Sequence, residues 1–159
     1  MIANMPPQLE IPASFLAYLQ ARPEMVAAYL FGSVAAGKAH KFSDVDVALL
    51  LAEGVDSKHA WDIMLEAMDK AEAAFGRRAD VAILNQAGSV VKFQVIHHGR
   101  LIFERDRKAR IGFEVHARNE YFDYKPYLDE QYREFLKRLK TEGLGYGHKR
   151  RARALAKTR

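Results

Sequence analysis

The chain has 159 residues, of which 49% are hydrophobic, and it carries a formal net charge of +5 and no cysteine. This length suits one domain with a real core plus an extension, and it is too short for two full domains. The lack of cysteine excludes disulfides and thiolate metal sites, and no apolar run approaches the roughly 18 residues that span a bilayer. We therefore expect a cytoplasmic protein with no membrane partner.

The first part of the chain predicts a helix followed by a strand. Residues 1–12 contain three prolines and form an irregular lead-in, whereas apolar spacing predicts a helix from residue 14 that Pro23 ends. A strand over 26–31 then runs into Gly32 and Ser33. Glycine and serine suit a tight turn into a helix start, where a hydroxyl and free backbone N–H groups bind phosphate oxygens.

A second strand opens with two aspartates one residue apart, Asp44 and Asp46. Side chains alternate between the faces of a strand, so both carboxylates point the same way, with α-carbons roughly 6.5 Å apart. Carboxylates at that spacing can bridge two divalent ions roughly 3.5–4 Å apart, as in-line attack on phosphorus requires. The run 47–51 is apolar throughout, which indicates a strand buried on both faces.

These two segments carry a family resemblance. Gly32-Ser33, ten residues and then Asp44-x-Asp46 resemble the signature of the DNA polymerase β-like nucleotidyltransferases, and Asp80 in a third short strand matches their third carboxylate. The small size and the Leu-Phe-Gly-Ser opening are similar to the minimal nucleotidyltransferase antitoxins of HEPN/MNT toxin–antitoxin pairs. The resemblance covers most of the chain and implies an α/β (α+β) fold, a small mixed sheet with flanking helices and a C-terminal helical extension.

The resemblance also implies an activity. Such an antitoxin transfers AMP from ATP to a tyrosine hydroxyl of its cognate HEPN RNase toxin, which silences the toxin. By the same resemblance, Asp44, Asp46 and Asp80 would be catalytic and hold two Mg²⁺ ions. The nucleotide would be bound by a second group of residues: Gly32, Ser33 and Lys38.

One departure from the family pattern leaves alternatives open. The small subgroup has arginine in the turn after Gly-Ser, whereas this chain has Ala36, then Gly37 and Lys38. A planar bidentate donor is therefore lost, and lysine replaces it only as a point charge. This favours a second reading, a non-catalytic antitoxin that neutralises its toxin by binding alone. A third reading, adenylation of a small molecule such as an aminoglycoside, ranks last because such enzymes generally need a larger acceptor domain.

The remaining helices and strands are predicted from the spacing of apolar residues and from residues that end helices and strands. Ser57 is expected to cap a helix over 57–75, and its core face is expected to carry residues that recur at spacings of three and four: Trp61, Met64, Leu65, Met68 and Ala71. We expect a third strand near Asp80, a helix over 90–97 and an edge strand over 100–104. From residue 106 the pattern is helical, and Pro126 separates two segments.

We therefore divide the chain into a nucleotidyltransferase core over 1–104, C-terminal helices over 105–142 and a basic, flexible tail over 143–159. Exposed aromatic and basic residues on those helices suit either a protein-binding surface or a cover for the sheet. Six positive charges and no acid lie in 148–159, so subtracting six from +5 leaves the rest of the chain near −1. Such a tail contacts nucleic acid or an acidic surface, or is simply solvated.

Overall fold

The computed structural model describes residues 9–32 and 43–142. The chain divides into two compact units, Met1–Tyr121 and Phe122–Arg159. The first unit is the predicted mixture of helices and strands, and the last helix continues into the second. In chain order the elements are α1 (Ala13–Ala21), β1 (Met25–Phe31), β2 (Val45–Leu51), α3 (Ser57–Phe75), β3 (Ala79–Ile83), the 3₁₀ turn η1 (Leu84–Gln86), α4 (Ser89–His98), β4 (Arg100–Glu104) and α5 (Arg107–Glu142).

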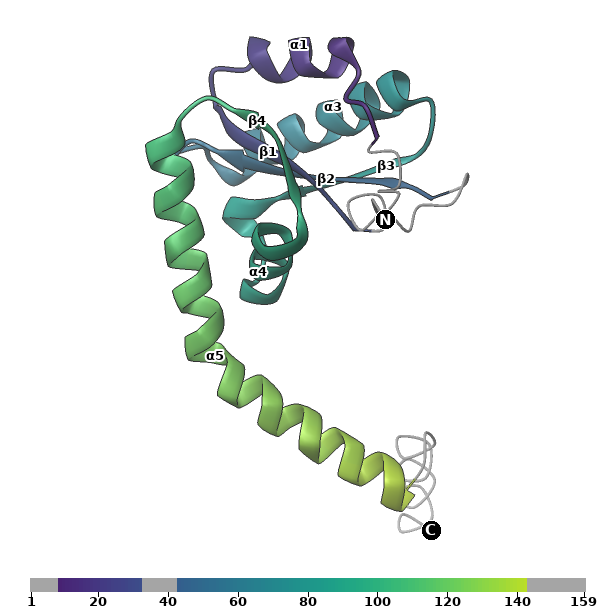
Figure 1. Cartoon of the computed structure of the whole chain (residues 1–159), viewed down its shortest axis with the longest axis vertical. Helices are drawn as coiled ribbons and strands as arrows, with labels where there is room; N and C mark the ends of the chain where they lie inside the picture. The colour runs from purple at the N-terminus through teal and green to yellow at the C-terminus, as the bar shows by residue number, and fades with distance from the viewer. Residues whose placement is uncertain (1–8, 33–42, 143–159) are drawn as a thin grey trace, which may run out of the picture. The chain divides into compact units, whose positions relative to one another are not determined.

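The four strands form one mixed sheet in the order β3-β2-β1-β4. Strand β1 is antiparallel to both β2 and β4, whereas β2 and β3 are parallel. A parallel pair needs a crossover, and α3 supplies it between β2 and β3. Helices α1 and α3 lie on one side of the sheet and α4 on the other (Figure 1). The predicted fold class and the edge position of β4 are therefore confirmed.

The sheet separates two layers of core. On one face, Phe15 and Leu19 of α1 and Ile63 of α3 pack against alternate residues of β1, β2 and β3. On the other face, Val95 of α4 packs with a second alternating set that includes Tyr29. Because β2 is an inner strand between two layers, six of its seven residues are buried and the seventh is half-buried. The predicted burial of the run 47–51 on both faces is confirmed.

Helix α3 contradicts two predictions. Its N-cap is Asp56, whose carboxylate accepts a hydrogen bond of 2.9 Å from the backbone N–H of His59, so Ser57 is the first helical residue and not the cap. Trp61 is 56% exposed, so its predicted place in the core is wrong. The buried residues of the helix are Ala60, Ile63, Ala67 and Ala71, so the predicted burial of Ala71 is confirmed, and Met64 and Met68 are partly buried against the core. Small residues let a helix approach the sheet closely, so the most deeply buried line of α3 passes through its alanines and Ile63, whereas Trp61 and Leu65 are exposed.

Helix α5 contradicts a third prediction, because it is one continuous helix with Pro126 inside it. Proline removes one backbone hydrogen bond, to the carbonyl of Phe122, and crowds that carbonyl. The proline lies on an exposed stretch of the helix, and the ion pair of 2.6 Å between Lys125 and Asp129 spans it. The predicted break at this position is therefore wrong. No helix within residues 9–32 and 43–142 is long and apolar enough to cross a membrane.

The first turns of α5 are fastened to the sheet by polar contacts. The Tyr29 hydroxyl donates a 2.8 Å hydrogen bond to Glu114, and Arg110 forms ion pairs with both Glu114 and Glu104. Burial, reinforced by the Glu114 carboxylate, raises the pKa of Tyr29. The tyrosine therefore stays neutral and remains a donor. These contacts hold α5 against β1 and β4.

Asn85 provides a test of how η1 stabilises the sheet. Its side-chain amide accepts a hydrogen bond from the N–H of Leu51 and donates one to the carbonyl of Leu51, both at 2.9 Å. Asn85→Ala leaves both groups of a buried residue unpaired, so we expect a loss of about 1–3 kcal/mol in the free energy of unfolding. Urea titration followed by circular dichroism measures this loss. Gln86→Ala, one residue along the same turn, is the control and should change stability by less than about 0.5 kcal/mol.

Candidate active site

The site lies where β1 ends and β2 and β3 begin. Phe31 lies opposite Asp46 in the antiparallel pair, and Asp46 lies opposite Asp80 in the parallel pair. Residues directly opposite each other on neighbouring strands point to the same face of a sheet. Asp46 and Asp80 therefore share one face, the face that α4 covers. Asp44 lies just before β2, two residues from Asp46.

The electrostatics of Asp46 show that the three acids influence one another. Partial burial raises the pKa of the Asp46 carboxyl first, and the negative charges of Asp80 and Asp44 raise it further. No cation in the described part of the chain offsets this repulsion. A group of carboxylates that repel one another is the donor set that a hard divalent cation neutralises. The three residues therefore fit Mg²⁺ by chemistry.

The acids do not form a finished coordination shell. Among the described residues, no three acidic or histidine side chains are gathered closely enough to hold a metal ion as they stand. Magnesium seldom uses an all-protein cage, because it keeps several waters and takes one or two carboxylates together with substrate phosphates. Asp44 and Asp80 are exposed, and Asp46 is half-buried between them and the core. Such an arrangement leaves coordination positions for a bound nucleotide.

Gly32 brings the backbone against the Asp46 carboxylate. Its φ is +68°, in the left-handed region that residues with a side chain rarely adopt. A Cβ at this position would lie 2.0 Å from Oδ2 of Asp46, so no side chain fits. Glycine is therefore required here for two independent reasons. Ser33 and Lys38, and Ala36 between them, lie outside the described residues, so their predicted roles stay predictions.

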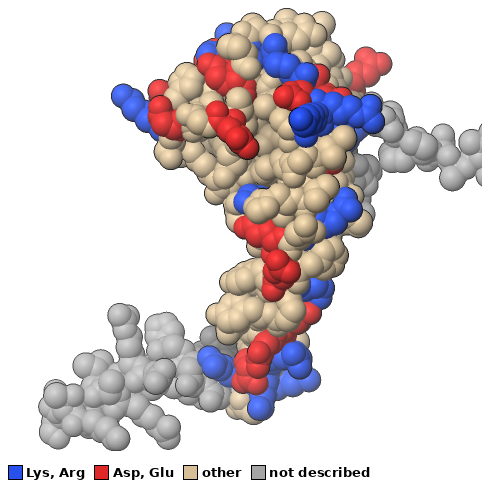
Figure 2. Space-filling model, turned by 90° about the vertical axis from the view of Figure 1, so that its left-hand side faces the viewer, with Lys and Arg blue, Asp and Glu red and all other residues tan. Residues whose placement is uncertain are grey.

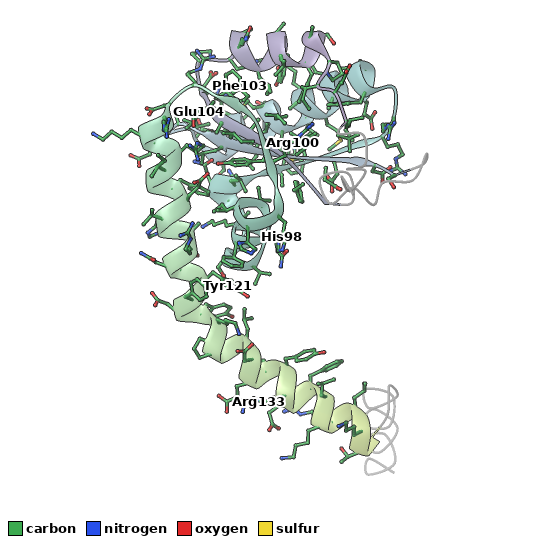
Figure 3. The ribbon with its side chains drawn as sticks, in the orientation of Figure 1. His98, Arg100, Phe103, Glu104, Tyr121 and Arg133 are labelled. Carbon is green, nitrogen blue, oxygen red and sulfur yellow. The ribbon has the colours of Figure 1, made fainter. Side chains whose placement is uncertain are left out.

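In the structure the C-terminal end of α4 lies at this edge of the sheet. The sequence predicted the helix but not its position. A Cβ on Gly99, just after α4, would lie 3.1 Å from the carbonyl oxygen of Leu30, two residues before Gly32. His98 ends the helix at this edge, on the side of the sheet where α4 lies (Figure 3). Farther along α4, the Phe93 ring stacks on Tyr121 of α5 with centroids 3.9 Å apart. Phe93 and Tyr121 are far apart in the chain, and no local pattern predicts that contact.

Comparison with known proteins identifies similar sequences and structures. A curated relative, the protein adenylyltransferase MntA of Shewanella oneidensis, is 31% identical over 81 residues. That match covers 51% of this chain and spans about half, 55%, of the relative's length.

Solved structures share the fold at lower identity. A toxin–antitoxin crystal structure with AMP-PNP matches with a TM-score of 0.57 and 24% identity, over 73% of this chain and 94% of that chain. A complex of the tri-AMPylated Shewanella oneidensis HEPN toxin with its MNT antitoxin matches with a TM-score of 0.51 and 22% identity, over 72% of this chain and 91% of that chain. At these identities the likeness is one of fold.

The family model described as polymerase beta, nucleotidyltransferase matches residues 15–108. This range begins in α1 and ends in the first turn of α5, so it contains the whole sheet and all three aspartates. It covers more than half of the chain. The chain therefore belongs to the polymerase beta nucleotidyltransferase family.

Proposed function

We propose that this chain is an antitoxin-type protein adenylyltransferase, which transfers AMP from ATP to a tyrosine hydroxyl of a HEPN-domain RNase toxin. The observation that carries the proposal is the register of the parallel pair, which sets Asp80 beside Asp46 at the edge where Gly32 ends β1. The likeness to MntA, a protein adenylyltransferase, supports the reaction type. The partner is proposed from the complexes with HEPN toxin that share the fold.

In this mechanism each group at the edge has one task. The turn at Gly32 and Ser33 binds the β- and γ-phosphates through backbone N–H groups and the hydroxyl. Asp44, Asp46 and Asp80 would hold two Mg²⁺ ions, which supply positive charge against the α-phosphate and the leaving pyrophosphate. Asp80 is exposed and can be reached by an acceptor.

The transfer of AMP forms one bond to phosphorus and breaks another. The tyrosine oxygen attacks the α-phosphorus, and the bond from that phosphorus to the bridging oxygen of the β-phosphate breaks, so pyrophosphate leaves. The hydroxyl proton passes to the Asp80 carboxylate, which is the general base. The product tyrosine carries a phosphodiester, which adds negative charge and bulk. On an RNase such a group repels RNA phosphates, which is how the modification inactivates the toxin.

A second function, neutralisation of the toxin by binding alone, rests on the alanine at position 36 where the family pattern has arginine. Without a bidentate donor the nucleotide phosphates are held less well. The two functions differ in their need for the acids. Binding alone survives the replacement of Asp44 and Asp46 by asparagine, whereas transfer of AMP does not.

The first prediction tests the reaction. The purified chain, mixed with its cognate HEPN toxin, Mg²⁺ and ATP labelled at the α-phosphate, should place label on the toxin. Asp44→Asn and Asp46→Asn should each lower the initial rate at least about a hundredfold. Each variant loses a carboxylate that would hold Mg²⁺, and with it the positive charge that stabilises the reacting phosphate. Asp62→Asn, an exposed acid on α3, is the matched control and should leave the rate unchanged. A toxin without label, but still silenced by both asparagine variants, would establish the binding function instead.

The second prediction tests the metal through stability. The folded-state pKa of Asp46 is above its ordinary value, so folding favours the protonated form. The resulting stability is present at low pH and is lost as pH rises from the unfolded pKa through the folded one. Asp46→Asn keeps a neutral side chain at every pH. In metal-free buffer near pH 7 it should therefore melt at a higher temperature than the parent chain, and the difference should disappear in acid.

Magnesium should reverse that order. Binding requires the ionised carboxylate, so Mg²⁺ should raise the Tm of the parent chain and not that of Asp46→Asn. Differential scanning calorimetry with and without Mg²⁺ measures both effects, and Asp62→Asn should behave as the parent does. An equal rise for Asp46→Asn and the parent would show that Asp46 does not bind the ion.

The third prediction separates backbone strain from the contact at Gly32. Gly32 and Gly76 have nearly the same φ, +68° and +65°, but no atom lies within 4 Å of a Cβ placed on Gly76. Gly76→Ala should therefore lower the free energy of unfolding only by the cost of a left-handed backbone, about 1–2 kcal/mol. Gly32→Ala adds a collision with Asp46, so it should lose more stability and at least about tenfold in transfer rate. Equal losses in both variants, measured by thermal melting and label transfer, would remove the special role of Gly32.

A further inference from the structure

The second compact unit begins at Phe122, and its described part is the end of α5. This segment, 122–142, exposes large side chains: Tyr132 is 63% exposed, Phe135 55% and Tyr124 44%. Isolated helices gain little stability from propensity alone and usually depend on packing of an apolar face. The segment therefore has the exposed aromatic side chains that are typical of a helix with a packing partner.

Five of its eight large apolar and aromatic side chains lie in one stripe, and Phe122, Tyr127 and Leu136 lie outside it. Tyr124, Leu128, Tyr132, Phe135 and Leu139 follow one another at intervals of four, four, three and four residues. At about 100° per residue these positions fall within an arc of about 80°, a narrow stripe along which another helix can pack. Pro126 falls on the opposite side of the helix, so its ring lies outside the stripe. We call these five residues the seam.

The charges along the segment differ between its two halves. Residues 122–131 contain three acids and one lysine, a net charge of −2, whereas 132–142 contain four basic residues and two acids, a net charge of +2. Basic side chains gather around the described end of α5 in Figure 2. A second copy laid antiparallel puts each acidic half beside a basic half. A parallel copy puts like charges together, which is unfavourable.

We propose that residues 122–142 pair antiparallel with the same segment of a second copy, so that the chain forms a homodimer through a two-stranded coiled coil. The contact is isologous, with a two-fold axis through the centre of the seam. Tyr132 meets Tyr132 of the second copy close to that axis. Tyr124 faces Leu139 of the second copy, and Leu128 faces its Phe135. The ring-to-ring contact at the centre adds to the area buried.

This dimer is independent of the proposed function. The seam contains none of Gly32, Asp44, Asp46 or Asp80, and the pairing makes no contact that the transfer of AMP requires. Failure of the dimer would leave the transferase proposal standing, and failure of label transfer would leave the dimer standing.

The association is tested on the full-length chain alone by sedimentation equilibrium. We expect twice the chain mass of 18.1 kDa at concentrations of about 50 μM. Leu128→Glu combined with Phe135→Glu buries two carboxylates in the seam and should weaken association at least about a hundredfold, which gives a monomer. Phe122→Glu makes the same change at an exposed site outside the seam and should remain dimeric. A parent chain that is monomeric at this concentration would overturn the proposal.

The orientation is tested by cross-linking, for which the chain is suited because it has no cysteine. Under mild oxidation Tyr132→Cys should form a disulfide-linked dimer with itself. Tyr124→Cys and Leu139→Cys should cross-link when mixed, and neither should cross-link alone. Cross-links of Tyr124→Cys with itself would indicate a parallel pair and overturn the proposal. The proposal would also be overturned if the seam binds the toxin instead of a second copy. In that case the chain alone would be monomeric, and the Leu128→Glu, Phe135→Glu variant would lose its complex with the toxin.

Discussion

The site depends on one structural constraint, the parallel pairing of β2 with β3. Strand β3 follows a 19-residue helix, and a shift of one residue in its register would turn Asp80 to the opposite face of the sheet. The core prevents that shift. Val81 and Ile83 alternate with Asp80 and are buried against α3, so a shifted strand would expose them and bury the acid. The same packing that stabilises the sheet therefore places the second carboxylate beside the first.

At the edge that results, an acidic side chain lies in a row that is otherwise apolar and buried. Asp46 continues the side-chain row of Ala48 and Leu50, which are buried, and its charge is disfavoured there by burial and by two neighbouring acids. Because Gly32 has no side chain, the backbone can approach the same carboxylate. A partly buried carboxylate beside two further acids is typical of a functional site, because stability alone would not select it. The inner part of the sheet, with a core layer on each face, compensates for this cost.

Helix α5 combines two different parts in one continuous element. Its first turns are bound to the sheet by Tyr29, Arg110 and Glu114, whereas its second half belongs to a separate unit with exposed aromatic side chains. Pro126 lies within the second of these parts and does not end the helix. A helix that is anchored at one end and carries a seam at the other suits a catalytic domain that assembles with a second chain.

The sequence by itself determined the parts of the structure that depend on local pattern. Gly32 next to Ser33, the alternation that puts Asp44 and Asp46 on one face, and the apolar run of β2 all follow from the period of a strand. Tertiary structure decided what depends on residues far apart in the chain. The face of Asp80 was set by the β2–β3 register, the buried stripe of α3 by how closely alanines let it approach the sheet, and the approach of α4 to Leu30 by packing across the sheet. Local periodicity cannot choose between adjacent stripes or registers, because that choice is made by the volume that another segment leaves to be filled.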